Sequence, residues 1–152
     1  MDDVRGFFEE YRFLSNFWPC TVSYGGVVFP TVENAYQAAK CANPHDIAQF
    51  AALTPAEAKK RGGEIALRAD WNEVRVVVMA DLLAQKFSDP ALCAGLLQTG
   101  TAQLVEDNTW DDRFWGVCGG QGENNLGKLL MQLRAHLAAQ QAAPVRKPPA
   151  RG

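Results

Sequence analysis

Three side chains that could do chemistry lie at helical spacing in the segment PTVENAYQAAK, residues 30–40. At about 100° per residue, Glu33, Gln37 and Lys40 lie on one flank of a helix, within roughly 60° of each other. A carboxylate on such a flank can activate water or stabilise a developing positive charge, and a lysine can contact a phosphate. An ordinary amphipathic helix also has a polar edge of this kind, so the segment alone leaves both interpretations open.

A second chemical group lies in the segment from Asn108 to Asn125, which combines aromatic, acidic and glycine residues. Aromatic faces such as that of Trp115 stack on nucleobases with about 1–3 kcal/mol per base, and Asp112 could bind a ribose hydroxyl or act as a base. We expect Trp110 to fill the core. Trp71 is either a packing residue or a base platform.

Glycines in this segment suggest an anion site. Gly116, Gly119, Gly120 and Gly122 precede a predicted helix start near Asn124, and glycine lets backbone N–H groups approach a phosphate closely. The pattern is neither a Walker A sequence nor a dinucleotide-binding fingerprint, so a flexible connection is the alternative.

The elements that position these groups are mostly helices. A hairpin is predicted over residues 21–29, with its turn at Gly25-Gly26, and Thr31 is predicted to cap the helix that carries Glu33. Residues 70–87 form a wide apolar surface and should be the central buried helix, although the valine run could form a strand. The other predicted elements are helices starting at Asn43, Thr54, Asp70 and Asp89, a short strand at 103–106 and a helix from Leu126. The fold class is α+β, dominated by helices.

Length and composition indicate one domain, residues 1–143, followed by a basic, proline-rich tail at 144–152 that we expect to be disordered. The net charge of −2 gives no general attraction to nucleic acid or acidic membranes. The four cysteines have no metal-ligand spacing, so we expect free thiols, no metal, no cofactor and a cytoplasmic protein; secretion would instead allow two disulfides.

Ordered motifs across most of the chain resemble the NADAR family, also called the YbiA-like or RibX N-glycosidases. The resemblance lies in FLSNF at 13–17, PTVENAYQAAK at 30–40, Trp71, LVE at 104–106, DRFWG at 112–116 and GENNLGKLLMQLR at 122–134. It implies a YbiA-like fold. It also implies cleavage of an N-glycosidic bond, either in phosphorylated riboflavin-pathway intermediates or between ADP-ribose and a base, including ADP-ribosylated nucleic acid.

The resemblance implies that Glu33 is catalytic, with Asp112 in reserve and Lys40 nearby. Residues that match other motif positions, and that are expected to bind substrate, are Ser15, Asn16, Phe17, Gln37, Trp71, Trp115, Gly116, Gly120, Gly122 and Asn124. Asn16 would read a polar edge of the base, or would simply form a turn.

We therefore expect an N-glycoside hydrolase in which a carboxylate stabilises an oxocarbenium-like ribose and activates water. In a rival mechanism a neutral Lys40 attacks the sugar and forms a Schiff base. Two alternatives of another class are a non-catalytic ADP-ribose or nucleotide-binding module and an interaction domain that uses the basic tail.

Overall fold

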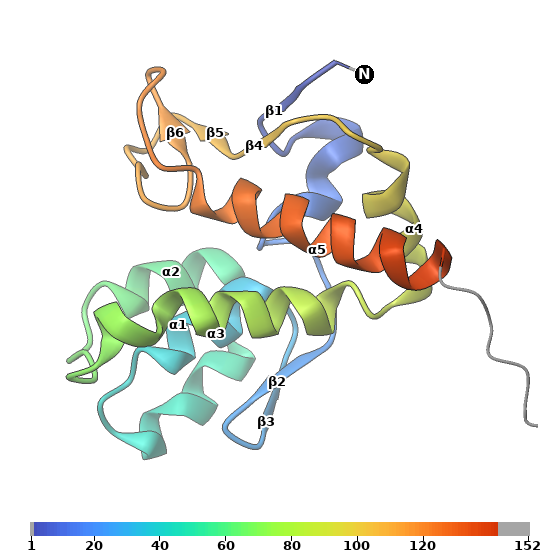
Figure 1. The fold of residues 1–152 in the computed structure, drawn as a ribbon. Coiled ribbons are helices and arrows are strands. Elements are labelled where there is room, and N and C mark those ends of the chain that lie inside the picture. Colours follow the sequence, from blue (N-terminus) through green and yellow to red (C-terminus); the bar gives the residue numbers. More distant parts are fainter. Residues whose placement is uncertain (1, 143–152) are drawn as a thin grey trace, which may run out of the picture.

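Helix α1 (Val32–Ala39) lies at the centre of the fold, because each of its eight residues is buried. The computed structural model describes residues 2–142, and in it α1 packs against α2 (Pro55–Gly62), α3 (Trp71–Lys86) and the 3-10 helix η2 (Pro44–Ala52) (Figure 1). The prediction that residues 70–87 form the central buried helix is therefore wrong. Helix α3 is a helix, but Val77 on its outer face is 69% exposed. The alanines of α1 let neighbouring elements approach from all sides.

The first turn of α1 is fixed by the predicted cap. The Oγ1 atom of Thr31 accepts a hydrogen bond from the backbone N–H of Asn34 at 3.0 Å. The side-chain amide of Asn34, which is fully buried, donates to the carbonyl oxygens of Phe50 and Leu53 at 2.8 Å each. One side chain therefore satisfies two buried acceptors of the neighbouring segment and ties that segment to the first turn of α1.

The predicted hairpin is confirmed. Strands β2 (Val22–Tyr24) and β3 (Val27–Phe29) pair antiparallel, with Tyr24 opposite Val27. The two turn residues, Gly25 and Gly26, have φ angles of 58° and 79°, which glycine adopts more readily than residues with a side chain.

Most predicted helix starts are confirmed by the side-chain caps at Asn43, Thr54 and Asp89, and Thr54 forms the expected capping box. The cap predicted at Asp70 is wrong, because its side chain accepts no hydrogen bond from the start of α3. Both carboxylate oxygens of Asp70 instead accept from the guanidinium of Arg68, at 2.6 and 3.0 Å.

The remaining elements gather around the long helix α5 (Asn125–Ala142), which packs against α3, α4 (Pro90–Gln98) and β4 (Leu104–Val105) (Figure 1). They are β1 (Val4–Arg5), η1 (Glu9–Leu14), α4 (Pro90–Gln98), β4 (Leu104–Val105), β5 (Asp107–Asn108) and β6 (Val117–Cys118). Strand β1 pairs with β4 and β5 pairs with β6, both in parallel. The predicted helix-rich α+β class with short strands is confirmed. The predicted disordered tail lies outside the described residues.

None of the described helices is both long and apolar enough to cross a lipid bilayer.

Lys86, near the end of α3, is buried, with 1% of its surface exposed, and its Nζ donates to the carbonyl oxygen of Ser15 at 2.8 Å. Burial lowers the pKa of Lys86 to about 7, opposed by nearby Cys20. Because the unfolded lysine keeps its proton up to about pH 10, the unfolded state binds more protons between pH 7 and 10.

The free energy of unfolding should therefore rise over this range by up to about 1.4 kcal/mol per pH unit. The variant Lys86→Met should lack that slope. Urea unfolding of both proteins at several pH values checks the difference, and equal slopes would contradict it.

Candidate active site

A cavity of about 890 Å³ opens beside the first turn of α1, a volume typical of small-molecule sites. Its walls come from the loop before β2, from α1 and α3, and from the segment after β4. The sequence-predicted residues that line it are Ser15, Asn16, Phe17, Glu33, Gln37, Lys40, Trp71, Asp112 and Trp115. Residues up to 100 positions apart in the sequence thus lie at one cavity.

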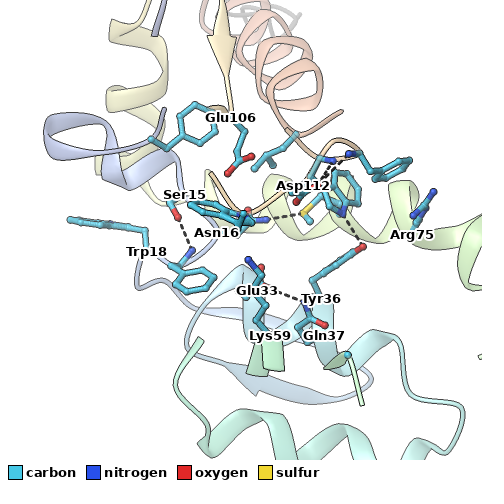
Figure 2. A pocket seen from close by; sticks show the side chains of 18 of the residues that line it. Ser15, Asn16, Trp18, Glu33, Tyr36, Gln37, Lys59, Arg75, Glu106 and Asp112 are labelled. Carbon is cyan, nitrogen blue, oxygen red and sulfur yellow. Dashed lines mark hydrogen bonds between the residues drawn. The ribbon is translucent and has the colours of Figure 1, made fainter. Parts of the chain in front are cut away.

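Glu33 is 8% exposed and points into this cavity from α1 (Figure 2). Its Oε1 accepts from Nε2 of Gln37 at 2.8 Å, and its backbone N–H donates to the carbonyl oxygen of Asn16 at 3.0 Å. Burial raises the pKa of Glu33, while the Gln37 bond and the cations Lys59 and Lys40 oppose that rise. A carboxylate fixed in place with a raised pKa is suited to accept a proton near neutral pH.

The loop at residues 15–18 forms the wall next to Glu33. The Oγ of Ser15 accepts from the backbone N–H of Phe17 at 3.1 Å, so the predicted turn at Asn16 exists. The side chain of Asn16 also lines the cavity, and its Oδ1 is buried without a hydrogen-bond partner among the described residues. A buried acceptor of this kind is a place for a ligand N–H or O–H group.

Three aromatic rings lie together in the cavity wall, and one of them belongs to α1. The ring of Tyr36 lies 5.1 Å from that of Trp71 and 5.5 Å, edge to face, from that of Trp115. The indole Nε1 of Trp115 donates to Oη of Tyr36 at 2.9 Å. Trp71 is only 5% exposed, so it packs in the core and also contributes to the wall.

Asp112 shapes the loop that carries Trp115. Its Oδ1 accepts from the backbone N–H groups of Phe114 and Trp115, at 3.2 and 2.9 Å. These bonds orient Trp115 towards Tyr36, so Asp112 has a structural role whether or not it also contacts a ligand.

The start of α5, where a phosphate site is predicted, offers no free backbone N–H groups at residues 123–126. The backbone N–H groups of residues 123–126 donate to the carbonyl oxygens of residues 113–116, at 2.8 to 3.2 Å, and so are not free for an anion. The side chain of Asn124 bonds to the backbone of Leu104 and Glu106. None of Gly116, Gly120, Gly122 and Asn124 lines the cavity.

Four cationic side chains line the cavity, whereas the glycine-rich loop does not. They are Arg12, Lys40, Lys59 and Arg75. The guanidinium of Arg75 lies 3.5 Å from the centre of the Phe114 ring, and its buried Nε has no hydrogen-bond partner among the described residues. Lys59 lies over the ring of Trp110 at 4.8 Å. These side chains can hold a phosphate.

Several cavity residues were missed by the sequence analysis, above all Glu106, which lies within the LVE motif. The expectation that Trp110 fills the core is wrong, because it is 49% exposed at the cavity. Arg75 follows Trp71 by one helical turn, a spacing that could have identified it. Within residues 2–142 no cluster of three or more His, Cys, Asp or Glu side chains has the arrangement of a metal site.

Comparison with known proteins gives consistent matches. The family model described as the NADAR domain matches residues 5–138. The chain is 39% identical over 137 residues to the N-glycosidase YbiA of Escherichia coli (strain K12), covering 86% of this chain and 84% of that protein. A riboflavin biosynthesis protein of Vibrio vulnificus (strain YJ016) is 35% identical over 144 residues, 90% of this chain but only 38% of its own length. The NMR structure of E. coli YbiA superimposes with a TM-score of 0.80 at 34% identity, covering 96% of this chain and 92% of that one.

Proposed function

We propose that this chain, which belongs to the NADAR family, is an N-glycosidase. In this proposal it hydrolyses the bond between ribose and a base in a phosphorylated ribosyl compound. The observation that carries the proposal is the buried, hydrogen-bonded carboxylate of Glu33 in a cavity lined by aromatic and cationic side chains. Relatives that match this chain over most of its length are themselves N-glycosidases.

In the proposed reaction the bond between C1′ of the ribose and the base nitrogen breaks, and its electron pair leaves with the base. The ribose becomes an oxocarbenium-like cation, which the Glu33 carboxylate stabilises. Water then attacks C1′ and gives a proton to Glu33. Gln37, bonded to Oε1 of Glu33, keeps the carboxylate in position between these steps.

The side chains around Glu33 support the proposed substrate class. Trp71, Trp115, Lys59 and Arg75 line the same cavity. We infer that the two indole rings form a wall for the base and that the two cations hold the phosphate. Since a relative is a riboflavin biosynthesis protein, we propose a phosphorylated ribosyl intermediate of riboflavin synthesis as the substrate. An ADP-ribosyl compound, including ADP-ribosylated guanine in nucleic acid, is the second candidate.

The test is to incubate the protein separately with phosphoribosyl-aminopyrimidine intermediates, NAD, ADP-ribose and ADP-ribosylated guanine nucleotides, and to measure base release by chromatography. Release of base from the first group supports the proposal, and release only from the ADP-ribosyl compounds would assign the second candidate. Binding of these compounds in calorimetry without base release would instead indicate a non-catalytic nucleotide-binding module.

Lys40 makes a covalent variant of this reaction testable. Burial lowers the pKa of Lys40, opposed by nearby Glu33, and its Nζ lies 5.4 Å from the centre of the Tyr36 ring. A neutral amine could displace the base at C1′; ring opening would then give an imine, which water hydrolyses to the free sugar and the amine.

If Lys40 only contacts the phosphate or Glu33, borohydride added during turnover should leave the protein mass unchanged. In the covalent variant, borohydride reduces the imine to a secondary amine, and mass spectrometry should find the sugar on the peptide that contains Lys40. The variant Lys40→Arg keeps the charge and serves as the control.

A further inference from the structure

Glu106 is a second carboxyl group in the cavity, held by the segment between β4 and β5. Its backbone N–H donates to Oδ1 of Asn124 at 3.0 Å, and its carbonyl oxygen accepts from the N–H of Val117 at 2.8 Å. Figure 2 shows its side chain entering the cavity from the side opposite Glu33, with Asn16 between them. A ligand in the cavity would therefore lie between the two carboxyl groups.

The Glu106 carboxyl is oriented by a buried amide. Nδ2 of Asn108 donates to Oε2 of Glu106 at 2.9 Å and to the carbonyl oxygen of Asp112 at 2.8 Å. Oδ1 of Asn108 accepts from the N–H of Asp112 at 3.1 Å, so the amide cannot turn round without losing these bonds. Asn108 thus presents a donor to Oε2.

Gly116 explains how the carboxyl fits. A Cβ atom at this position would overlap Oε2 and the carbonyl oxygen of Glu106, as well as Nδ2 of Asn108. The glycine that the sequence suggested for ligand binding therefore leaves space for Glu106 and its amide partner.

The surroundings of Glu106 favour its protonated form. Burial and the negative charges of Asp112 and Asp107 raise its pKa to about 7, opposed by the Asn108 bond and by Lys59 of α2. At neutral pH a large share of Glu106 therefore carries a proton. Glu33 of α1, across the cavity, is the other glutamate among the lining residues described, and its carboxylate is bonded to Gln37.

We propose that Glu106 is the general acid of the reaction, the group that protonates the leaving base while Glu33 acts on the ribose side. This inference rests on the proposed function. As the bond from C1′ to the base nitrogen breaks, its electron pair goes to the base, and the proton of Glu106 transfers to a basic ring or exocyclic atom of that base. Water adds to C1′ and its proton goes to Glu33, so one water is consumed and the proton on Glu33 later returns to Glu106 through solvent.

The test compares two leaving groups. A phosphoribosyl-aminopyrimidine needs protonation to leave, whereas 4-nitrophenyl riboside 5-phosphate releases a stable phenolate without it. For Glu106→Gln we expect kcat/KM to fall about 10²-fold on the first substrate and less than about threefold on the second. The control Glu73→Gln, an exposed glutamate of α3, should change neither rate.

Equal losses on both substrates, or no loss on either, would overturn the assignment of Glu106 as an acid. If the wild type releases neither leaving group, the proposed function fails and the assignment fails with it. If Glu106→Gln does not fold, the pH dependence of the wild-type protein tests the proposal. Its kcat/KM should decline above about pH 7 for the aminopyrimidine substrate and not for the nitrophenyl substrate. The same decline with both substrates would overturn the proposal.

Discussion

Replacing Glu33 by glutamine should lower kcat for base release by about 10³-fold or more while leaving the fold intact. Glutamine has the size of glutamate, and its Oε1 can still accept from Nε2 of Gln37. What is lost is the negative charge beside the ribose cation and the group that takes a proton from water. Affinity for the substrate, measured by calorimetry, should change only a few-fold.

The pH dependence gives an independent check on Glu33. Because burial raises its pKa, wild-type kcat should fall on the acid side with a midpoint above the ordinary glutamate value. The folded state also binds more protons than the unfolded state in that window, so ionised Glu33 costs stability as the pH rises through it. The variant Glu33→Gln should therefore be as stable as the wild type, or more stable, at neutral pH. Full activity in Glu33→Gln would refute the catalytic role.

The second large effect should come from Asn34, which does not contact the cavity. Asn34→Ala leaves the buried carbonyl oxygens of Phe50 and Leu53 without their donor, and should lower the free energy of unfolding by about 3 kcal/mol. Asn34→Asp should cost more, because it places a carboxyl against the same two carbonyl oxygens.

Urea unfolding measures both changes at Asn34, with Asn72→Ala in the exposed face of α3 as the matched control. A loss below about 1 kcal/mol for Asn34→Ala would mean that the two carbonyl oxygens find other donors, and that this amide does not hold η2 against the first turn of α1.

Local signals in the sequence predicted much of the fold correctly. Caps at Thr31, Thr54 and Asp89 and the turn at Gly25-Gly26 depend on residues within a few positions, and these predictions hold. The burial of α1 was not predictable in the same way. Helical periodicity compares one face of a helix with the other, and it does not report that α2, α3 and η2 cover α1 from several directions.

In the candidate site, too, features local in the sequence were predicted and features that depend on distant segments were not. Glu33, Gln37 and Lys40 were found together because they share one helix, and the structure places all three in the cavity wall. Glu106 was not predicted because it follows a two-residue strand, which gives no periodic signal. It is also far from Glu33 in the sequence, so the sequence does not show that both side chains line one cavity.

The phosphate site predicted at the start of α5 shows the same limit of local sequence signals. Glycine content suggests accessible backbone amides, but it does not reveal that the carbonyl oxygens of residues 113–116 already accept the N–H groups of residues 123–126 at the helix start. Only the path of the chain in space shows which amides remain available.

Two hydrogen bonds tie the loop at 15–18 to two helices. One runs from the Glu33 N–H to the Asn16 carbonyl oxygen, and the other runs from Lys86 to the carbonyl oxygen of Ser15. A lid must swing away from the site to admit a molecule, and this loop could not do so without breaking both bonds. Phe17 and Trp18 of this loop line the cavity and are partly exposed, so they can move by side-chain rotation, which is faster by orders of magnitude than loop opening. Turnover in this protein should accordingly be limited by bond cleavage or product departure rather than by gating.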